Sequence, residues 1–158
     1  MHFLNDGRRC PSSPGPVKLE EIVALGLYHP DLIDKDTGKI TKEALKTDVL
    51  GEHTVIDNCG ESSGLSVARL ATQPDLNELK AVISQIASRP KKDGTERVVV
   101  GHSTVAVKWL IDNGTSVLDD GKIGFASHAV VRSTMKRSAV KKLREDMIGE
   151  LNKTLVRW

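Results

Sequence analysis

Four side chains in this sequence are of types that carry out nucleophilic or acid–base chemistry, and they fall in three separate stretches of the chain. His102 and Ser103 are adjacent, Cys59 lies in a polar loop rich in small residues, and His128 follows 25 residues after Ser103. A serine or cysteine activated by an imidazole is sufficient for covalent hydrolysis. The sequence therefore predicts a small hydrolase of a small-molecule or peptide substrate, with Ser103 or Cys59 as nucleophile and His102 or His128 as base.

The stretch Gly101-His102-Ser103 follows three valines that are typical of a short buried strand. Gly101 permits a sharp turn, and the apolar residues of 105–111 favour a short buried helix that ends at Gly114. A strand, a tight turn and a helix form the core of an α/β unit, whose turn would present the His-Ser pair at an open rim. The alternative is a buried turn in which Ser103 only caps the helix and His102 is a surface residue.

Two known motifs are similar to this stretch. A strand, Gly101-His102-Ser103 and a helix resemble the nucleophile elbow of the α/β-hydrolases, which implies Ser103 as the nucleophile. That family has glycine two residues after the serine, where this chain has Val105. The stretch also resembles the second histidine motif of the histidine phosphatases, in which a Gly-His pair ends a strand and the imidazole faces a phosphate. The Arg-His-Gly motif of that family is absent from this sequence.

Cys59 precedes a possible helix at 65–71, and a thiolate near a helix N-terminus is activated when an imidazole approaches it. His53, His102 or His128 could provide that imidazole, as in a papain-like amidase. A small buried cysteine is the alternative. Cys10 and Cys59 are too few for a four-thiolate zinc site, and the histidines lack metal-ligand spacing. The sequence predicts no metal and no cofactor.

Composition places the chain among soluble globular proteins. Of its 158 residues, 39% are apolar and 28% charged, and no apolar run is long enough to cross a bilayer. The first residues lack the apolar stretch of a signal peptide. We therefore expect a soluble cytoplasmic protein without membrane contact.

The alternation of helical and extended patterns favours an α/β fold over an all-helical one. We expect a flexible N-terminal arm over 1–16, which is rich in proline, and a single α/β domain over 17–158. That domain would consist of a short sheet that contains 97–100 and is flanked by helices. Further helices are predicted between Pro16 and His29 and over 41–51, 65–71 and 76–88, and a hairpin over 116–131.

The C-terminal region is basic, because its last 27 residues carry eight Lys or Arg against three Asp or Glu. A long amphipathic helix is predicted over 134–157. Its apolar stripe recurs every four residues and comprises Met135, Ala139, Leu143, Met147, Leu151 and Leu155. A non-enzymatic binding or assembly module is the alternative to a hydrolase. Its polyanion contacts would come from Arg132, Lys136, Arg137 and Lys141, and the stripe would dock on the body or on a second copy in a homo-oligomer.

Overall fold

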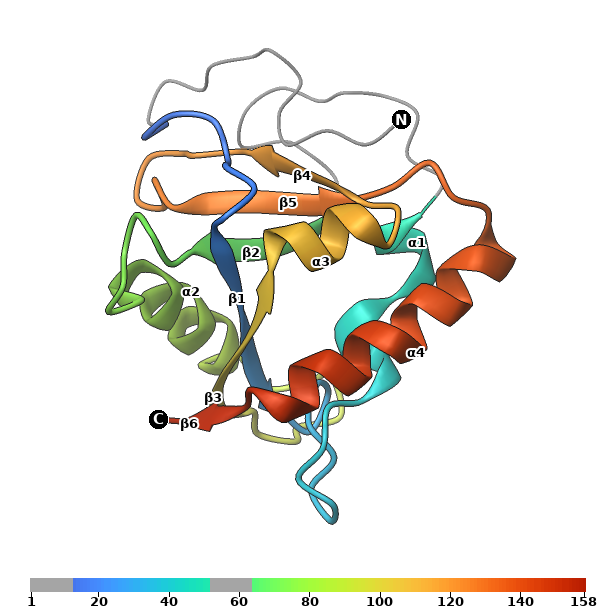
Figure 1. The fold of residues 1–158 in the computed structure, drawn as a ribbon. Coiled ribbons are helices and arrows are strands. Elements are labelled where there is room, and N and C mark those ends of the chain that lie inside the picture. Colours follow the sequence, from blue (N-terminus) through green and yellow to red (C-terminus); the bar gives the residue numbers. More distant parts are fainter. Residues whose placement is uncertain (1–12, 52–63) are drawn as a thin grey trace.

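A six-stranded antiparallel sheet forms the centre of the computed structural model, which describes residues 13–51 and 64–158 (Figure 1). The strands are β1 (Ile22–His29), β2 (Leu65–Arg69), β3 (Val98–Ala106), β4 (Ser116–Asp119), β5 (His128–Arg132) and β6 (Val156–Arg157). Their order across the sheet is β4-β5-β2-β1-β3-β6. The expected mixture of sheet and helices is confirmed. The antiparallel pairing differs from the α/β unit expected around the valine triplet, which would place strands in parallel.

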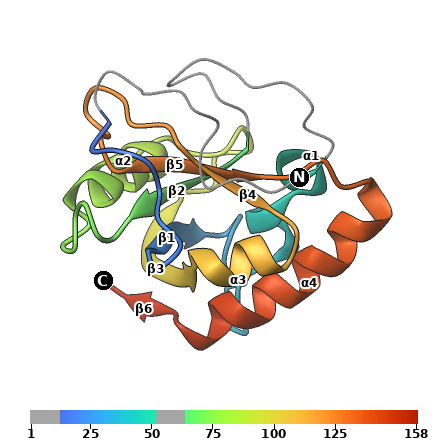
Figure 2. The same cartoon turned by 45° about the horizontal axis from the view of Figure 1, so that its top comes forward.

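Helices cover both faces of this sheet (Figures 1 and 2). They are the 3₁₀ helix η1 (Lys42–Leu45), α1 (Thr47–Leu50), α2 (Asn77–Ala87), α3 (Val107–Asp112) and α4 (Arg137–Lys153). One buried apolar cluster joins α1, α3 and α4 to the sheet, and a second joins α2 to the opposite face. The sheet therefore separates two cores, and its α2 face carries the smaller one.

Residues 22–29 form strand β1, so the helix predicted between Pro16 and His29 is wrong. Large and small side chains alternate in this stretch. Val23, Leu25 and Leu27 belong to the larger core, and Ala24 belongs to the core beneath α2. A side chain at Gly26 would overlap Ile83 of α2. The small residues thus allow α2 to pack closely on this face. The apolar pattern of 22–29 therefore has the period of two residues that is typical of a strand and not the 3.6-residue period of a helix.

Two other predicted helices also differ from the structure. The stretch 65–71 contains β2 instead of a helix, because Leu65 and Val67 face the larger core while Ser66 is exposed. The stretch 41–51 is helical only in two short pieces, η1 and α1, which are separated by an extended Lys46. By contrast, the helix over 76–88 is confirmed as α2, and the hairpin over 116–131 is confirmed as the antiparallel pair β4 and β5.

Strand β3 continues through Gly101 to Ala106, so the predicted turn at Gly101 is wrong. Gly101 pairs with Arg157 of β6, and a Cβ atom at this position would overlap the backbone of Val156. Trp158, which follows β6, extends this pairing, because its backbone N–H donates to the Val100 carbonyl at 3.0 Å. Glycine is therefore used here for the close approach of two backbones and not for a turn.

This close approach makes Gly101→Ala destabilising. We expect the added methyl group to displace β6 and to lower the free energy of unfolding by about 1–3 kcal/mol, the usual cost of overpacking. Urea unfolding followed by circular dichroism measures this change. Gly149→Ala is the matched control, because nothing lies within 4 Å of a Cβ atom at that helical position. An equal loss of stability in both variants would contradict the conclusion that Gly101 is required for the close approach of β6 to β3.

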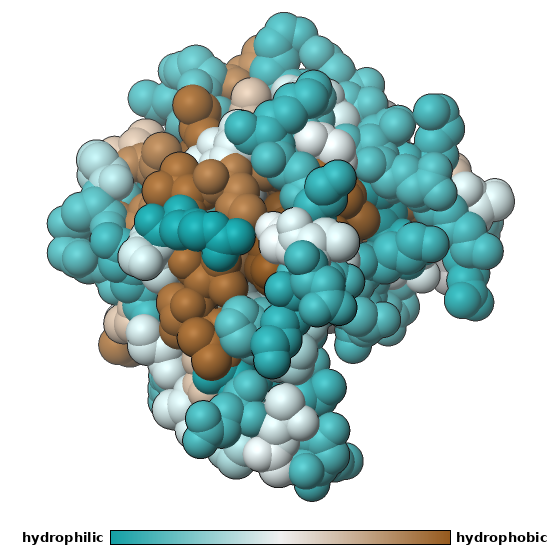
Figure 3. Space-filling model, turned by 90° about the horizontal axis from the view of Figure 1, so that it is seen from below, coloured by the Kyte–Doolittle hydropathy of each residue, from teal (hydrophilic) through white to brown (hydrophobic). Residues whose placement is uncertain are grey.

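An apolar area bordered by hydrophilic residues lies at one end of the molecule, where β3 begins and β6 pairs with it (Figure 3). Exposed apolar side chains at these strands are Val98 and Val156, together with Trp158. Strand β6 pairs with only Gly101 and His102, so it covers part of the β3 edge.

The C-terminal helix α4 spans Arg137–Lys153, shorter at both ends than the predicted 134–157. The Ser133 hydroxyl donates to the Leu50 carbonyl at 2.8 Å and accepts from the Met135 N–H at 3.3 Å, and Lys136 is the residue that precedes the first helical turn. The buried side chains of α4 are Val140, Leu143, Met147 and Leu151, and all of these except Leu143 belong to the larger core. Of the predicted stripe, Leu143, Met147 and Leu151 are thus buried within the same chain, whereas Ala139 is exposed and Val140 is buried in its place.

Candidate functional site

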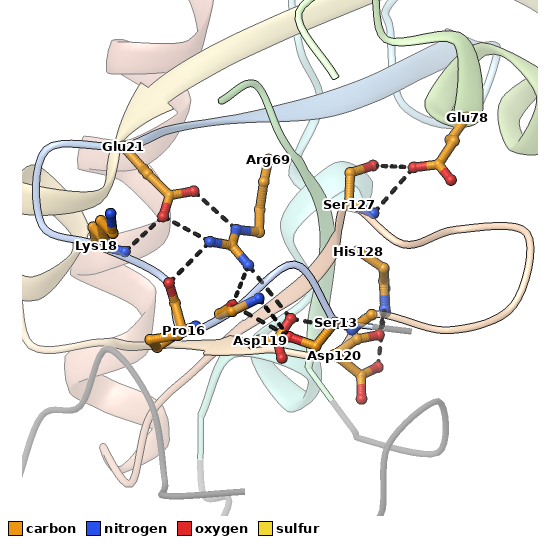
Figure 4. A network of polar contacts seen from close by, with 12 residues as sticks. Ser13, Pro16, Lys18, Glu21, Arg69, Glu78, Asp119, Asp120, Ser127 and His128 are labelled. Atoms are coloured by element: carbon orange, nitrogen blue, oxygen red, sulfur yellow. Dashed lines mark hydrogen bonds and ion pairs between the residues drawn. The ribbon is translucent and has the colours of Figure 1, made fainter. Parts of the chain in front are cut away.

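Buried polar side chains gather where β2 and β4 end, where β5 begins and where the chain enters β1 (Figure 4). They belong to two adjoining groups. One is centred on Arg69 and the other on His128, and their acidic members Asp119 and Asp120 are neighbours in sequence. Charged groups are seldom buried without function or pairing, so this end of the sheet is where chemistry is most expected.

His128 is the first residue of β5, and Asp120 begins the loop that leads to it. The imidazole Nδ1 lies 2.9 Å from Asp120 Oδ2 and 3.1 Å from the Asp120 carbonyl oxygen. The Asp120 backbone N–H donates in turn to the His128 carbonyl at 3.0 Å. Both side chains are almost fully buried. The start of the loop between β4 and β5 thus lies against the first residue of β5, and Asp120 contacts the imidazole on its Nδ1 side.

These contacts decide which ring nitrogen of the neutral imidazole carries the proton. Both Asp120 atoms near Nδ1 are oxygen acceptors, so Nδ1 must be the protonated nitrogen and Nε2 the free lone pair. Nε2 lies 3.1 Å from the Ser66 hydroxyl oxygen. Ser66 therefore donates its O–H to His128, the direction that a general base requires.

Sheet register brings Ser66 and His128 together. Ser66 of β2 is opposite Val130 of β5, and Ala68 is opposite His128, so the two polar side chains are diagonal neighbours on one face. Ser66 is exposed whereas the imidazole is buried. A molecule from solution can thus reach the hydroxyl oxygen while the base behind it stays shielded from water.

Burial lowers the pKa of His128 below its ordinary value of 6.5, and the adjacent Asp120 only partly opposes this effect. The Phe125 ring, 4.9 Å away between centroids, contributes to the apolar surroundings. A depressed pKa keeps the imidazole neutral, and therefore able to accept a proton, at and somewhat below pH 6.5.

This shift gives a stability prediction with a defined sign. Unfolded His128 binds a proton below about pH 6.5, whereas the folded side chain resists protonation. The contribution of His128 to stability is therefore lost as the pH falls from the unfolded pKa towards the folded one. Urea unfolding at pH 7.5 and pH 5.5 should show a loss that His128→Gln reduces. An identical loss in the variant would assign the pH dependence to other groups.

Glu78 of α2 fixes the loop between β4 and β5. Its carboxylate accepts hydrogen bonds from the backbone N–H of Ala126, from the backbone N–H of Ser127 and from the Ser127 hydroxyl, at 2.6–3.0 Å. Burial alone would raise the pKa of Glu78, but these donors outweigh it and the pKa lies below the ordinary range. The Glu78 contacts immediately precede His128, so they position the start of β5.

Arg69, at the end of β2, is the centre of the second group. Its guanidinium forms a two-bond pair with the Glu21 carboxylate, both bonds at 2.8 Å, and lies 3.5 Å from Asp119. It also donates to the carbonyls of Gly15 and Pro16. Burial opposes ionisation of Glu21, but Arg69 and the Lys18 backbone N–H hold its pKa below the ordinary value. Residues 15 and 16 of the predicted flexible arm are thus tied to the sheet.

The predicted pair His102 and Ser103 lies elsewhere. Ser103 is completely buried in β3 and donates to the Leu151 carbonyl at 2.7 Å, so it does not face an open rim. The Trp158 indole N–H donates to His102 Nδ1 at 2.8 Å. Strands β1 and β2 separate β3 from β5, so neither residue joins His128. This placement does not fit a nucleophile and its base.

Cys59 and His53 lie outside the described residues, as does Cys10, and predictions about them remain untested. Sequence reasoning did not identify Ser66 or Asp120. Asp120 lies within the hairpin predicted over 116–131, and its spacing from His128 across that hairpin is the signal that could have suggested a contact. Ser66 gives no local signal, because its meeting with His128 depends on the pairing of β2 with β5.

Of the basic residues predicted to contact a polyanion, Arg132 is buried, whereas Lys136, Arg137 and Lys141 are exposed. Arg132 is therefore not available to such a partner. In the two described ranges, no three or more His, Cys, Asp or Glu gather to hold a metal ion. Nor does any helix there have the length and apolar character needed to cross a membrane.

Comparison with known proteins gives no relative. The chain matches no family model, and no curated protein and no solved structure is significantly similar to it. The functional argument therefore depends on the geometry of the described residues.

Proposed function

We propose that this protein is a hydrolase of esters or amides in which Ser66 is the nucleophile, His128 the general base and Asp120 the group that orients the base. The supporting observation is the pair of contacts at the two imidazole nitrogens, 3.1 Å from Nε2 to the Ser66 hydroxyl and 2.9 Å from Nδ1 to the Asp120 carboxylate. A nucleophile, a base and an orienting carboxylate in this relation define serine hydrolysis on unrelated folds.

Each group then has one task. The Ser66 oxygen attacks the carbonyl carbon of the substrate as its proton moves to His128 Nε2. The same proton passes to the leaving alcohol or amine, which departs and leaves an acyl group on Ser66. Water attacks this ester, again with His128 accepting a proton, and the carboxylic acid and free Ser66 are released. Asp120 stabilises the imidazolium that forms twice in this cycle.

The predicted hydrolase class is kept, but with a different serine. Ser66 replaces Ser103 because, of these two serines, Ser66 is the one that is exposed and in contact with an imidazole of suitable tautomer. Cys59 remains a second nucleophile predicted from sequence alone. Thiol and hydroxyl nucleophiles can be separated by experiment, because iodoacetamide alkylates a thiolate, whereas an activated serine displaces fluoride from a fluorophosphonate and becomes phosphonylated.

Hydrolysis of p-nitrophenyl acetate tests the proposal. Ser66→Ala should lower the rate by about 100-fold or more, since it removes the nucleophile. Ser84→Ala, which removes an exposed hydroxyl from α2, should leave the rate unchanged. If Ser66→Ala retains the full rate and Cys59→Ala abolishes it, the nucleophile is the cysteine and the assignment of Ser66 is wrong. Absence of hydrolysis in the unaltered protein would oppose both.

A further inference from the structure

A second, basic site lies between α4 and the helical pieces η1 and α1, on the face of the sheet opposite Ser66 and His128. It is a hollow of about 450 Å³. Its lining consists of four cationic side chains, two carboxylates and one hydroxyl, namely Lys42, Lys46, Arg137, Arg144, Glu43, Asp48 and Thr47. A volume of this size accommodates a small organic ligand.

The four cations come as two pairs from facing elements. Arg137 and Arg144 are seven residues apart on α4, two helical turns, and therefore project from one side of that helix. Lys42 and Lys46 come from η1 and the residue that precedes α1. Two arginines thus meet two lysines across the hollow, an arrangement that suits a group with several negatively charged oxygens.

The carboxylates of the lining do not neutralise these cations. Glu43 pairs with Lys46 at 3.8 Å, and both side chains are more than half exposed, so this pair contributes little. With Asp48 counted as well, four positive charges face two negative ones. The first turn of α4 lies at the same place, because Arg137 is its first residue, and the positive end of the helix dipole adds to the attraction for an anion.

Arg144 gives the second, independent observation. Its Nε atom is shielded from solvent, yet no atom of residues 13–51 or 64–158 accepts a hydrogen bond from it. A shielded N–H donor without an acceptor is unfavourable, because it has lost its hydrogen bonds to water and gained none in return. Arg144 also lines the hollow, so an oxyanion bound there would lie beside this guanidinium.

We infer that this hollow binds the phosphate groups of a small phosphorylated ligand, such as a diphosphate ester. The inference is independent of the proposed hydrolase, since it uses none of the residues near His128. It differs from the predicted polyanion contact through the exposed α4 surface. Arg137 is common to both, whereas Arg144, Lys42 and Lys46 belong only to the hollow.

Isothermal titration with pyrophosphate, on the full chain at low and at physiological salt, tests the inference. We expect binding that weakens about 10-fold or more in Arg137→Gln and in Arg144→Gln, the loss expected for a bidentate arginine contact. Lys142→Gln removes the same charge from α4 but lies outside the hollow, where Lys142 pairs with Asp146 at 3.3 Å. It should change the dissociation constant less than twofold.

Arg137 is exposed, so its variant keeps the inference testable even if the partly buried Arg144 variant fails to fold. Absence of pyrophosphate binding in the unaltered protein would overturn the inference. Equal weakening by Lys142→Gln would also overturn it, because the attraction would then be general to α4. Binding of a long polyanion such as heparin without binding of pyrophosphate would instead assign the basic residues to an extended surface.

Discussion

His128→Gln is expected to lower the hydrolysis of p-nitrophenyl acetate by about 100- to 10,000-fold, the contribution of a positioned general base. Glutamine retains a polar side chain that can contact Asp120 and Ser66, but it cannot take a proton from the serine at neutral pH. The substitution should lower kcat by a larger factor than it raises KM, because the base acts on the reacting atoms. Rates measured at saturating and at low substrate concentration separate these two parameters.

The matched control for this variant is His102→Gln. His102 is the other imidazole in the described part of the chain that the sequence predicted as a base, and it contacts Trp158 instead of a serine. Its variant should retain the full rate. Thermal unfolding of both variants separates loss of chemistry from loss of structure. If His102→Gln lost activity while His128→Gln kept the full rate, the base would be His102 of β3, and the assignment of His128 as the general base would be wrong.

Arg69→Met is expected to lower the free energy of unfolding by about 3–5 kcal/mol, the largest stability change that we predict. The substitution preserves much of the side-chain length and apolar stem but removes the partner of the Glu21 carboxylate. Glu21 is 7% exposed, so its charge would be left in a poorly solvated position. The carbonyls of Gly15 and Pro16 would also lose their donors.

Urea unfolding at pH 7 measures this loss, and Arg97→Met provides a surface control. Arg97 pairs with Asp31 at 2.9 Å, but both side chains are about one-fifth exposed, and the expected loss is near 1 kcal/mol. Adding Glu21→Gln to Arg69→Met should recover part of the loss, because the unpaired charge is removed. A loss in Arg69→Met no greater than that in Arg97→Met would contradict the role of Arg69.

The elements that the sequence predicted correctly are those whose patterns are local. The apolar positions of α2 recur at helical spacing, and the glycines between the two apolar runs indicate the hairpin of β4 and β5, although its turn lies at 122–125 and not at Asp120-Gly121. Strand β1 was mistaken for a helix because Val23 and Leu27 also suit one helical face. Only the pairing of β1 with β2 and β3 shows that alternate side chains face opposite cores.

The site was harder to predict than the fold, because its members meet through strand register. His128 was identified by residue type, and its orientation by Asp120 spans a hairpin that the sequence did indicate. Ser66 lies 62 residues from His128 in sequence, and nothing near it distinguishes it from other exposed serines. Ser103 was favoured because Gly101 suggested a turn, whereas that glycine allows β6 to approach β3.

The most direct measurement is mapping of a fluorophosphonate adduct by mass spectrometry after digestion of the labelled protein. We expect one adduct, on the peptide that contains Ser66, because His128 must be neutral to activate the serine. The labelling rate should fall with decreasing pH only below the ordinary imidazole pKa of 6.5, since burial lowers the pKa of His128. His128→Gln should abolish the adduct. An unlabelled Ser66, or an adduct on Ser103 in its place, would contradict the account.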